Sequence, residues 1–409
     1  MRILKVTESY APFYEFGGPP VKVQALAKGL AERGHRVTVL SADWGFESRR
    51  PAGTTGARRS PFGWMSEEDG VEALYLPTWL RYRSLTWNPA VARYCRARLG
   101  QFEVVHIFGL YDLLGPSVAR ECTKRGIPYV VEPIGMFVPI VRSILLKRLY
   151  HRLLGAPMLA GSSAVVATAE QELEELAGGG IPRSKLSLRR NGVMVPRDLP
   201  AAGDFRLRHG LPADALVVLF LGRLSEKKSP GMLLEAFARL PASVFGREVR
   251  LVFAGPDESR MQLRLEQLSE SLGVKERVSF PGPLFGAAKW SAYVDSDVFV
   301  LPSQNENFGN TAAEAAACGT PVVITDACGV APLLAGTAGV VVPHETGALA
   351  EAVQRVLFDR ELRARLSMGG RRIAGRLGWD EPLAAAERLY NSIAGLAHGR
   401  SGNSGFAVC

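Results

Sequence analysis

Short apolar runs alternate with segments of helical periodicity along most of this chain, and the series occurs twice. The first series opens with apolar runs at residues 2–6 and 36–41, separated by a helical pattern at 21–35. The second opens with ALVVLFLGR at residues 215–223, followed by a helical pattern at 230–240. Such alternation is typical of parallel strands joined by crossover helices. The chain is therefore predicted to form two doubly wound α/β domains.

The restart of the pattern sets the expected domain boundaries. We expect an N-terminal Rossmann-like domain at residues 1–197 and a C-terminal one at 198–378. A closing helix at 379–397 is expected to pack back toward the N-terminal domain, and 398–409 to be a disordered tail. Residues 48–70, rich in Gly, Pro and Ser, interrupt the pattern as a long loop, which is either a flap near an acceptor site or a disordered insertion.

Composition limits the choice of partner and compartment. The formal net charge of +9 favours a phosphate-bearing partner or a solvated basic surface, and no nucleic-acid-binding signature occurs. The five cysteines show no metal or disulfide spacing, which favours a reducing cytoplasm. The first residues do not resemble a signal peptide, and no apolar run reaches the roughly 18 residues that span a bilayer. Any membrane contact is expected to be peripheral.

Two glutamates bracket a Phe-Gly-Asn-Thr turn at the expected start of a helix. A helix start attracts anions. Thr311 and Glu314 fit a capping box, which is a structural alternative for Glu314 but leaves Glu306 unexplained. Carboxylates can accept hydrogen bonds from sugar hydroxyls while the amides from Gly309 to Thr311 receive phosphate. That layout matches a sugar nucleotide.

Basic side chains follow the first strand of the second series. Arg223 and the Lys227–Lys228 pair lie at its carboxyl end, where open α/β sheets bind ligands. They either grip phosphate oxygens or form a solvated basic loop. Gly17 and Gly18 precede the first long helix and either approach a ligand or make a plain turn. The sequence lacks a G-x-G-x-x-G fingerprint and a P-loop.

Together these segments resemble the family 4 retaining glycosyltransferases, which have the GT-B fold and an E-x(7)-E motif. ENFGNTAAEAAACGTPVV carries that motif, and the resemblance covers nearly the whole chain through GRLSEKK, NGV at residues 191–193, GGPPVKVQALAKGLAERGHRVTVLS and VVHIFGL. The resemblance implies two Rossmann-like domains facing a central cleft. Residues 1–197 would bind the acceptor and residues 198–378 the nucleotide-sugar donor.

The resemblance also implies roles for individual residues. Glu306 would hold donor-sugar hydroxyls, and Arg223 and Lys228 would neutralise the departing diphosphate. His106 would lie near the reaction centre, although a strand-end histidine with satisfied hydrogen bonds is an equal alternative. The implied donor-binding residues are Gly18, Asn307, Phe308, Gly309, Asn310, Thr311 and, at the ribose hydroxyls, Glu314.

One position departs from the family, and one motif competes with it. Ile134 stands where the family often has a histidine that bonds the donor sugar, and Glu132 is expected to point elsewhere. Asp295-Ser296-Asp297 matches the D-x-D motif of metal-dependent glycosyltransferases. Because it directly precedes an apolar strand, we interpret it as structural. The enzyme is expected to need no metal or other cofactor besides its nucleotide-sugar co-substrate.

Residues 138–159 mix apolar residues with Arg142, Lys147, Arg148 and Arg152. This segment could contact anionic lipid, but core-facing helices have the same composition, and we favour that interpretation.

The sequence thus predicts a retaining, metal-independent hexosyltransferase that moves a sugar from a UDP- or GDP-sugar to a carbohydrate or lipid-linked hydroxyl. We expect it in bacterial polysaccharide or glycolipid biosynthesis, in the cytoplasm or at the inner face of the plasma membrane. The alternatives are a sugar-nucleotide epimerase or hydrolase of the same fold and a non-enzymatic basic scaffold that binds membranes. Salt-dependent binding without donor affinity would identify the scaffold.

Overall fold

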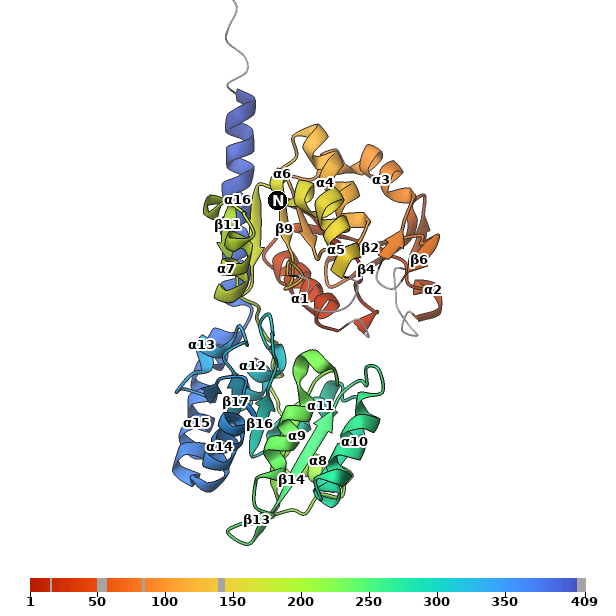
Figure 1. The fold of residues 1–409 in the computed structure, drawn as a ribbon. Helices are drawn as coiled ribbons and strands as arrows, with labels where there is room; N and C mark the ends of the chain where they lie inside the picture. The colour runs from red at the N-terminus through yellow and green to blue at the C-terminus, as the bar shows by residue number, and fades with distance from the viewer. Residues whose placement is uncertain (15–16, 50–56, 83–84, 139–143, 403–409) are drawn as a thin grey trace, which may run out of the picture. The chain divides into compact units, whose positions relative to one another are not determined.

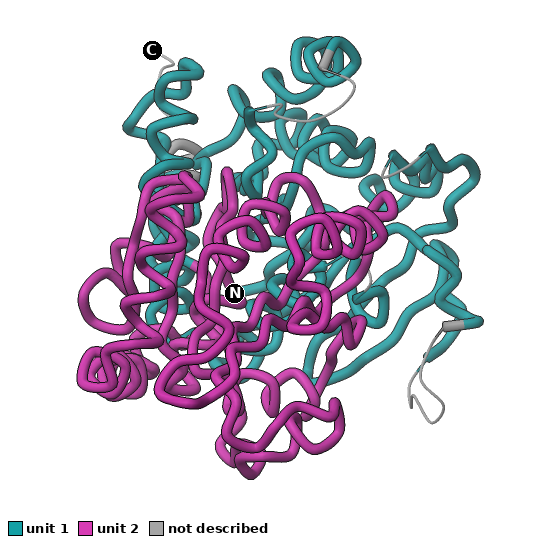
Figure 2. The backbone as a smooth tube through the Cα atoms, turned by 60° about the horizontal axis from the view of Figure 1, so that its bottom comes forward, with its two compact units in different colours: residues 1–190, 379–409 teal, residues 191–378 magenta. Residues whose placement is uncertain are grey.

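The computed structural model describes residues 1–14, 17–49, 57–82, 85–138 and 144–402. The chain forms two compact units, one of residues 1–190 with 379–409 and one of residues 191–378 (Figures 1 and 2). Each unit is an α/β layer structure built on a largely parallel sheet. The predicted pair of α/β domains is confirmed. The division falls at residue 191, whereas the sequence pattern placed it after residue 197.

Unit 1 contains a nine-stranded sheet in the order β11-β10-β9-β8-β1-β2-β5-β4-β3. The strands from β11 to β5 are parallel, and β4 and β3 add an antiparallel edge. Their bounds are β1 (Arg2–Thr7), β2 (Arg36–Ala42), β3 (Arg58–Ser60), β4 (Gly63–Glu68), β5 (Val71–Leu76), β8 (Val104–Phe108), β9 (Tyr129–Glu132), β10 (Ala164–Ala167) and β11 (Leu186–Leu188), with a separate hairpin of β6 (Leu80–Tyr82) and β7 (Leu85–Trp87).

The predicted loop at 48–70 is therefore partly wrong. Residues 58–68 supply the two edge strands, because Trp64, Met65 and Ser66 pair with β5 in regular antiparallel register. Residues 50–56 of that loop lie outside the described residues.

Alternating side chains of β1 face two different helical layers. Ile3 packs with α1 (Gly18–Glu32) and α16 (Asp380–Gly402), whereas Leu4 and Val6 pack with α3 (Ala90–Arg98), α4 (Leu114–Arg125) and α6 (Ala156–Gly161). The period of two along a strand produces this division. The remaining helices of the unit are α2 (Phe46–Arg49), α5 (Ile144–Tyr150), a π-helical turn (His151–Gly155) and α7 (Glu170–Gly178).

The last helix, α16, packs on unit 1. At the place where a Cβ of Gly29 would lie, the end of the Leu383 side chain is 2.5 Å away, so Leu383 of α16 packs directly against the backbone of α1 at Gly29. Glu387 binds Arg33 at 2.8 Å and His35 at 2.9 Å. The helix continues to Gly402, so the predicted disorder is wrong for 398–402, and 403–409 lie outside the described residues.

Unit 2 contains a seven-stranded sheet in the order β13-β14-β12-β16-β17-β18, with β15 beside β14. Only β13 is antiparallel. The strands are β12 (Leu216–Leu221), β13 (Ser243–Val244), β14 (Arg247–Ala254), β15 (Val278–Gly282), β16 (Val298–Leu301), β17 (Val322–Thr325) and β18 (Gly339–Val342). The helices are α8 (Asp204–Arg208), α9 (Pro230–Ala238), α10 (Met261–Ser271), α11 (Gly286–Val294), α12 (Asn310–Ala317), α13 (Ala331–Leu334), α14 (Thr346–Phe358) and α15 (Arg360–Ile373).

The strand order of unit 2 reverses between β12 and β16. From β12 the chain moves to β14 and β15 on one side, then returns to β16 on the other side. In open α/β sheets the crevice outside the carboxyl ends of strands at such a switch point is the usual ligand site.

Candidate active site

Lys228 and Glu306 meet at this switch point of unit 2. Lys228 ends the short 3₁₀ turn Glu226–Lys228 that follows β12, and Glu306 lies in the loop that follows β16. The Lys228 Nζ donates to Glu306 Oε2 at 2.6 Å, and both side chains are 21% exposed. The Lys228 side chain passes 3.6 Å from where a Cβ of Gly222 would lie. The two residues proposed from separate motifs thus form one ion pair.

The backbone around Glu306 is held by the loop after β17. The Glu306 amide donates to Ala327 at 2.9 Å, and its carbonyl accepts from Gly329 at 2.9 Å. The Phe308 carbonyl accepts from Val330 at 2.7 Å, and the Phe308 side chain is buried in the core. Only backbone atoms of Phe308 are therefore available to a ligand, and its role in donor binding stays a prediction.

Gly309 caps the start of α12 with a left-handed φ of 97°, a conformation that favours glycine. The helix begins at Asn310, and no side chain in the described part of the chain caps it. The capping box of Thr311 and Glu314, the structural alternative for Glu314, is therefore not formed. The Asn307 Oδ1 and Thr311 Oγ1 atoms are buried without a hydrogen-bond partner among the described residues. Since no side chain caps them, the first-turn amides of α12 can donate to an anion at this helix start.

Glu314 is held from α11 instead of by the helix start. Its Oε1 accepts from Lys289 Nζ and its Oε2 from the Tyr293 hydroxyl, each at 2.9 Å. Burial and the neighbouring Glu314 raise the pKa of Tyr293 well above its usual value, so Tyr293 stays a hydrogen-bond donor. The sequence analysis missed both partners. Their spacing of four residues, which places both on one helix face, was the available signal.

Arg223 lies at the same strand end but stands apart from the ion pair. It directly follows Gly222, its side chain is 47% exposed, and its nearest acid is Glu258 at 3.9 Å. Asn191, from the Asn-Gly-Val segment, reaches the start of α12, with its Nδ2 3.5 Å from Asn310 Oδ1. Unit 2 therefore joins Lys228 to Glu306 and Asn191 to the start of α12, whereas Arg223 and Glu314 contact other partners.

Of the two site residues predicted in unit 1, Gly18 lies at the start of a helix and His106 lies in a buried strand. Gly18 is the first residue of α1 after β1, and Gly17, with φ 91°, is the N-cap that favours glycine. His106 is 1% exposed, and its Nδ1 lies 2.6 Å from the Tyr390 hydroxyl of α16. Burial lowers the pKa of His106 to about 3, so the ring is neutral at pH 7. His106 is thus a buried strand-end histidine, and its placement near the reaction centre stays a prediction.

His106 belongs to a buried ionic cluster of unit 1 centred on Glu132. Glu132 is fully buried, accepts from Arg189 at 2.5 Å and forms an ion pair with Lys22. Although burial alone raises the pKa of a carboxyl, Arg189 and Lys22 outweigh it and hold the pKa of Glu132 well below its usual range. Lys5 completes the cluster, with its Nζ 3.3 Å from the Tyr390 hydroxyl.

Glu132, two residues before Ile134, is held with His106 inside this buried cluster. Ile134 itself adopts a left-handed φ of 56°, a strained conformation for a β-branched residue, and packs partly against the apolar core under α16.

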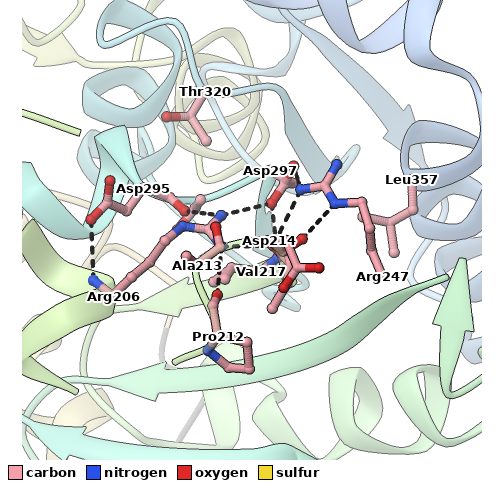
Figure 3. Close-up of polar contacts among 12 residues, drawn as sticks. Arg206, Pro212, Ala213, Asp214, Val217, Arg247, Asp295, Asp297, Thr320 and Leu357 are labelled. Carbon is pink, nitrogen blue, oxygen red and sulfur yellow. Dashed lines mark hydrogen bonds and ion pairs between the residues drawn. The ribbon is translucent and has the colours of Figure 1, made fainter. Parts of the chain in front are cut away.

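Asp295 and Asp297 are structural, as interpreted from sequence (Figure 3). Asp295 accepts from the amides of Gly203 at 2.5 Å and Phe205 at 2.8 Å. Asp297 pairs with Arg206 at 3.1 Å and Arg247 at 3.6 Å and accepts from the Val217 amide. Their oxygens hold β12 and α8 together, so the D-x-D reading as a diphosphate-metal site is not supported.

The two α/β units and the ion pair at the switch point fit a nucleotide-sugar-dependent glycosyltransferase of the GT-B type. The chain belongs to the family 4 glycosyltransferases. The family described as "Glycosyl transferases group 1" matches residues 203–373, and the "Glycosyl transferase 4-like domain" matches 17–192. The chain is therefore an enzyme that transfers sugar from a nucleotide-sugar donor, and a retaining mechanism fits this family.

Individual relatives agree with this assignment. The chain is 30% identical over 402 residues to the D-inositol 3-phosphate glycosyltransferase of Xylanimonas cellulosilytica, covering 91% of each chain. Its fold matches Anabaena HepE, solved in complex with UDP and glucose, with a TM-score of 0.74 at 20% identity over 97% of this chain and 100% of that one. Sucrose-phosphate synthase from Thermosynechococcus elongatus matches with a TM-score of 0.73 at 21% identity over 96% and 98%.

Proposed function

We propose that the chain transfers a sugar from a UDP- or GDP-linked donor to a hydroxyl of a carbohydrate or lipid-linked acceptor. The Lys228–Glu306 pair beside the uncapped start of α12 is the observation that carries this proposal. The diphosphate would lie against Lys228, Arg223 and the first amides of α12. Glu306 would then bind donor-sugar hydroxyls, and Glu314, oriented by Lys289 and Tyr293, would bind the ribose.

The proposed reaction breaks the bond between the anomeric carbon and the diphosphate oxygen. A new bond to the acceptor oxygen forms on the same face of the sugar, and the acceptor proton passes to the departing diphosphate. Fixed positive charge near the leaving oxygens stabilises the charge that develops there. Lys228, Arg223 and the helix start supply this charge, so we propose that no metal or further cofactor takes part.

An exposed aromatic hairpin supports a carbohydrate acceptor on unit 1. Trp79, Tyr82 and Trp87 are exposed on or beside the β6–β7 hairpin, and the Trp79 and Trp87 rings lie 5.8 Å apart. The side chains of Thr78, Thr86 and Asn88 anchor the hairpin base, and the Asn88 amide donates to the carbonyls of Leu76 and Pro77. Aromatic faces held in place suit the apolar faces of sugar rings. The hairpin follows the carboxyl end of β5, the ligand-binding edge of such sheets.

The cellular setting is part of the same proposal. We place the enzyme in bacterial polysaccharide or glycolipid biosynthesis, in the cytoplasm or at the inner face of the plasma membrane, without a nucleic-acid partner. Cys95, Cys122, Cys318 and Cys328 are buried free thiols, which suits a reducing compartment.

Thermal unfolding against a panel of nucleotide sugars tests the donor assignment, since a ligand that binds the native state raises the melting temperature. We expect one UDP- or GDP-sugar to stabilise the wild type, and we expect this stabilisation to be lost in Lys228→Ala.

The anomeric configuration of the product, determined by proton NMR, tests whether the reaction proceeds with retention. Stabilisation by no nucleotide sugar would contradict the donor, and donor turnover without any acceptor would favour the epimerase or hydrolase.

A further inference from the structure

A leucine stripe on α5 and the following π-helical turn faces solvent. Leu145 is 81% exposed, Leu146 50%, Leu149 52% and Leu153 62%. Three of them recur every fourth residue, which places them on one side of a helix. The interpretation of this segment as core-facing is therefore wrong for these four leucines.

The opposite face of the same segment holds it on unit 1. The Tyr150 hydroxyl donates to the Asp112 carbonyl at 2.6 Å, and the His151 ring lies 5.4 Å from that of Phe137. Met158 and Leu159 of the following α6 are buried in the core. The segment therefore turns its polar rings inward and its leucines outward, the reverse of an ordinary surface helix.

The segment that carries the stripe has charged side chains of one sign. Arg148 and Arg152 are exposed on this segment, one helical turn apart, and Lys147 lies beside them. Residues 133–169 contain no aspartate or glutamate. Arginine side chains of this kind keep their charge at a lipid headgroup while their stems lie along the apolar surface.

We propose that the leucine stripe of residues 145–153 docks on the surface of an anionic phospholipid bilayer. The leucines enter the acyl boundary, and Arg148 and Arg152 bind headgroup phosphates, with the segment lying in the membrane plane. A second copy of this chain is a poorer occupant, because its identical surface carries the same positive charge. Within the described residues no helix is both long and apolar enough to cross a bilayer. This surface extends the membrane location within the proposed function.

Sedimentation of the full chain with vesicles tests the proposal. We expect binding to vesicles of phosphatidylglycerol and phosphatidylcholine, weakening with salt, and little binding to phosphatidylcholine alone. The variant Leu145→Ser/Leu149→Ser/Leu153→Ser should lower the vesicle partition coefficient at least about tenfold. Arg148→Gln/Arg152→Gln should lower it and flatten its salt dependence. Leu207→Ser is the matched control, since Leu207 is 84% exposed between two arginines of α8 and should behave as wild type.

Measurements without vesicles separate this proposal from the donor assignment. The serine variant should keep wild-type melting and nucleotide-sugar stabilisation, which excludes misfolding. No binding of wild type to anionic vesicles at low salt, or equal binding by the serine variant, overturns the docking surface. If the wild type self-associates but does not bind vesicles, and the serine variant does not self-associate, the surface is an interface between copies and the membrane proposal is overturned. Vesicle binding without any nucleotide-sugar binding would support the docking surface and refute the proposed donor.

Discussion

The Nζ of Lys228 lies 2.6 Å from Oε2 of Glu306, so the ends of two adjacent strands share one ion pair. The loops that carry them follow β12 and β16, on either side of the point where the strand order reverses. Lys228, which we propose binds the diphosphate, therefore lies beside Glu306, which we propose binds sugar hydroxyls. Each orients the other, and both are partly open to solvent.

Replacing Lys228 by alanine should lower kcat/KM for the donor by about 10²–10³, the usual effect of losing one group that stabilises developing charge. Initial-rate kinetics with varied nucleotide sugar measure this. Lys275→Ala is the control, because Lys275 is an exposed lysine of the same unit paired with Glu270. Near-normal transfer by Lys228→Ala would count against the proposed phosphate grip.

Arg223→Ala should also lower turnover strongly and weaken binding of the nucleoside diphosphate product. Arg223 is half exposed with only a distant acid partner, so its guanidinium can turn toward phosphate at little cost. Calorimetric titration with UDP and GDP measures the affinity. Arg264→Ala, which removes an exposed arginine paired with Glu226, should change neither quantity. Equal behaviour of the two variants would remove Arg223 from the site.

Tyr293→Phe should raise the donor KM several-fold with a smaller effect on kcat. The substitution removes the hydroxyl that holds Glu314 Oε2 and leaves the buried ring in place. The lost hydrogen bond to a carboxylate should lower the unfolding free energy by about 1–3 kcal/mol. Steady-state kinetics and urea unfolding test the two effects separately. An unchanged KM would show that Glu314 needs no positioning by Tyr293.

Lys5 should make stability depend on pH near neutrality. Burial, with Arg189 nearby, lowers the pKa of Lys5 from 10.5 to about 7. Between these values the unfolded chain binds the proton that the folded chain lacks, so this contribution to stability rises with pH across that window. Relative to wild type, Lys5→Met should therefore gain stability as pH falls from about 9 to 7, by about 2 kcal/mol at most.

Urea unfolding of both proteins across this range gives the difference, which cancels the other titrating groups. A constant difference would mean that Lys5 stays protonated throughout.

Asp297→Asn should lower the melting temperature and leave the donor KM unchanged. Asp297 binds Arg206, Arg247 and the Val217 amide, and none of these groups has a proposed role in donor binding. Under the proposed metal-free mechanism, EDTA should leave wild-type transfer unchanged. Activity lost to EDTA and restored by Mg²⁺ or Mn²⁺ would refute that mechanism.

Local sequence determined the strands, the crossover helices and the strand-end location of Arg223, Lys228 and Glu306. The physical reason is that hydrophobic periodicity is a local property, and the carboxyl end of a parallel strand is fixed once the strand is recognised. The E-x(7)-E spacing likewise placed Glu314 on α12, inside the helix that Gly309 starts.

Tertiary structure decided which side chains face water and which partners they meet. His106 is buried because α16, from the far end of the chain, lays Tyr390 over it, and no local pattern specifies that contact. Glu314 meets Lys289 and Tyr293 only after α11 packs beside α12. The leucines of α5 point outward because Tyr150 and His151 take the inner face. Burial depends on what packs against a residue from elsewhere in the chain, so local periodicity alone leaves it undetermined.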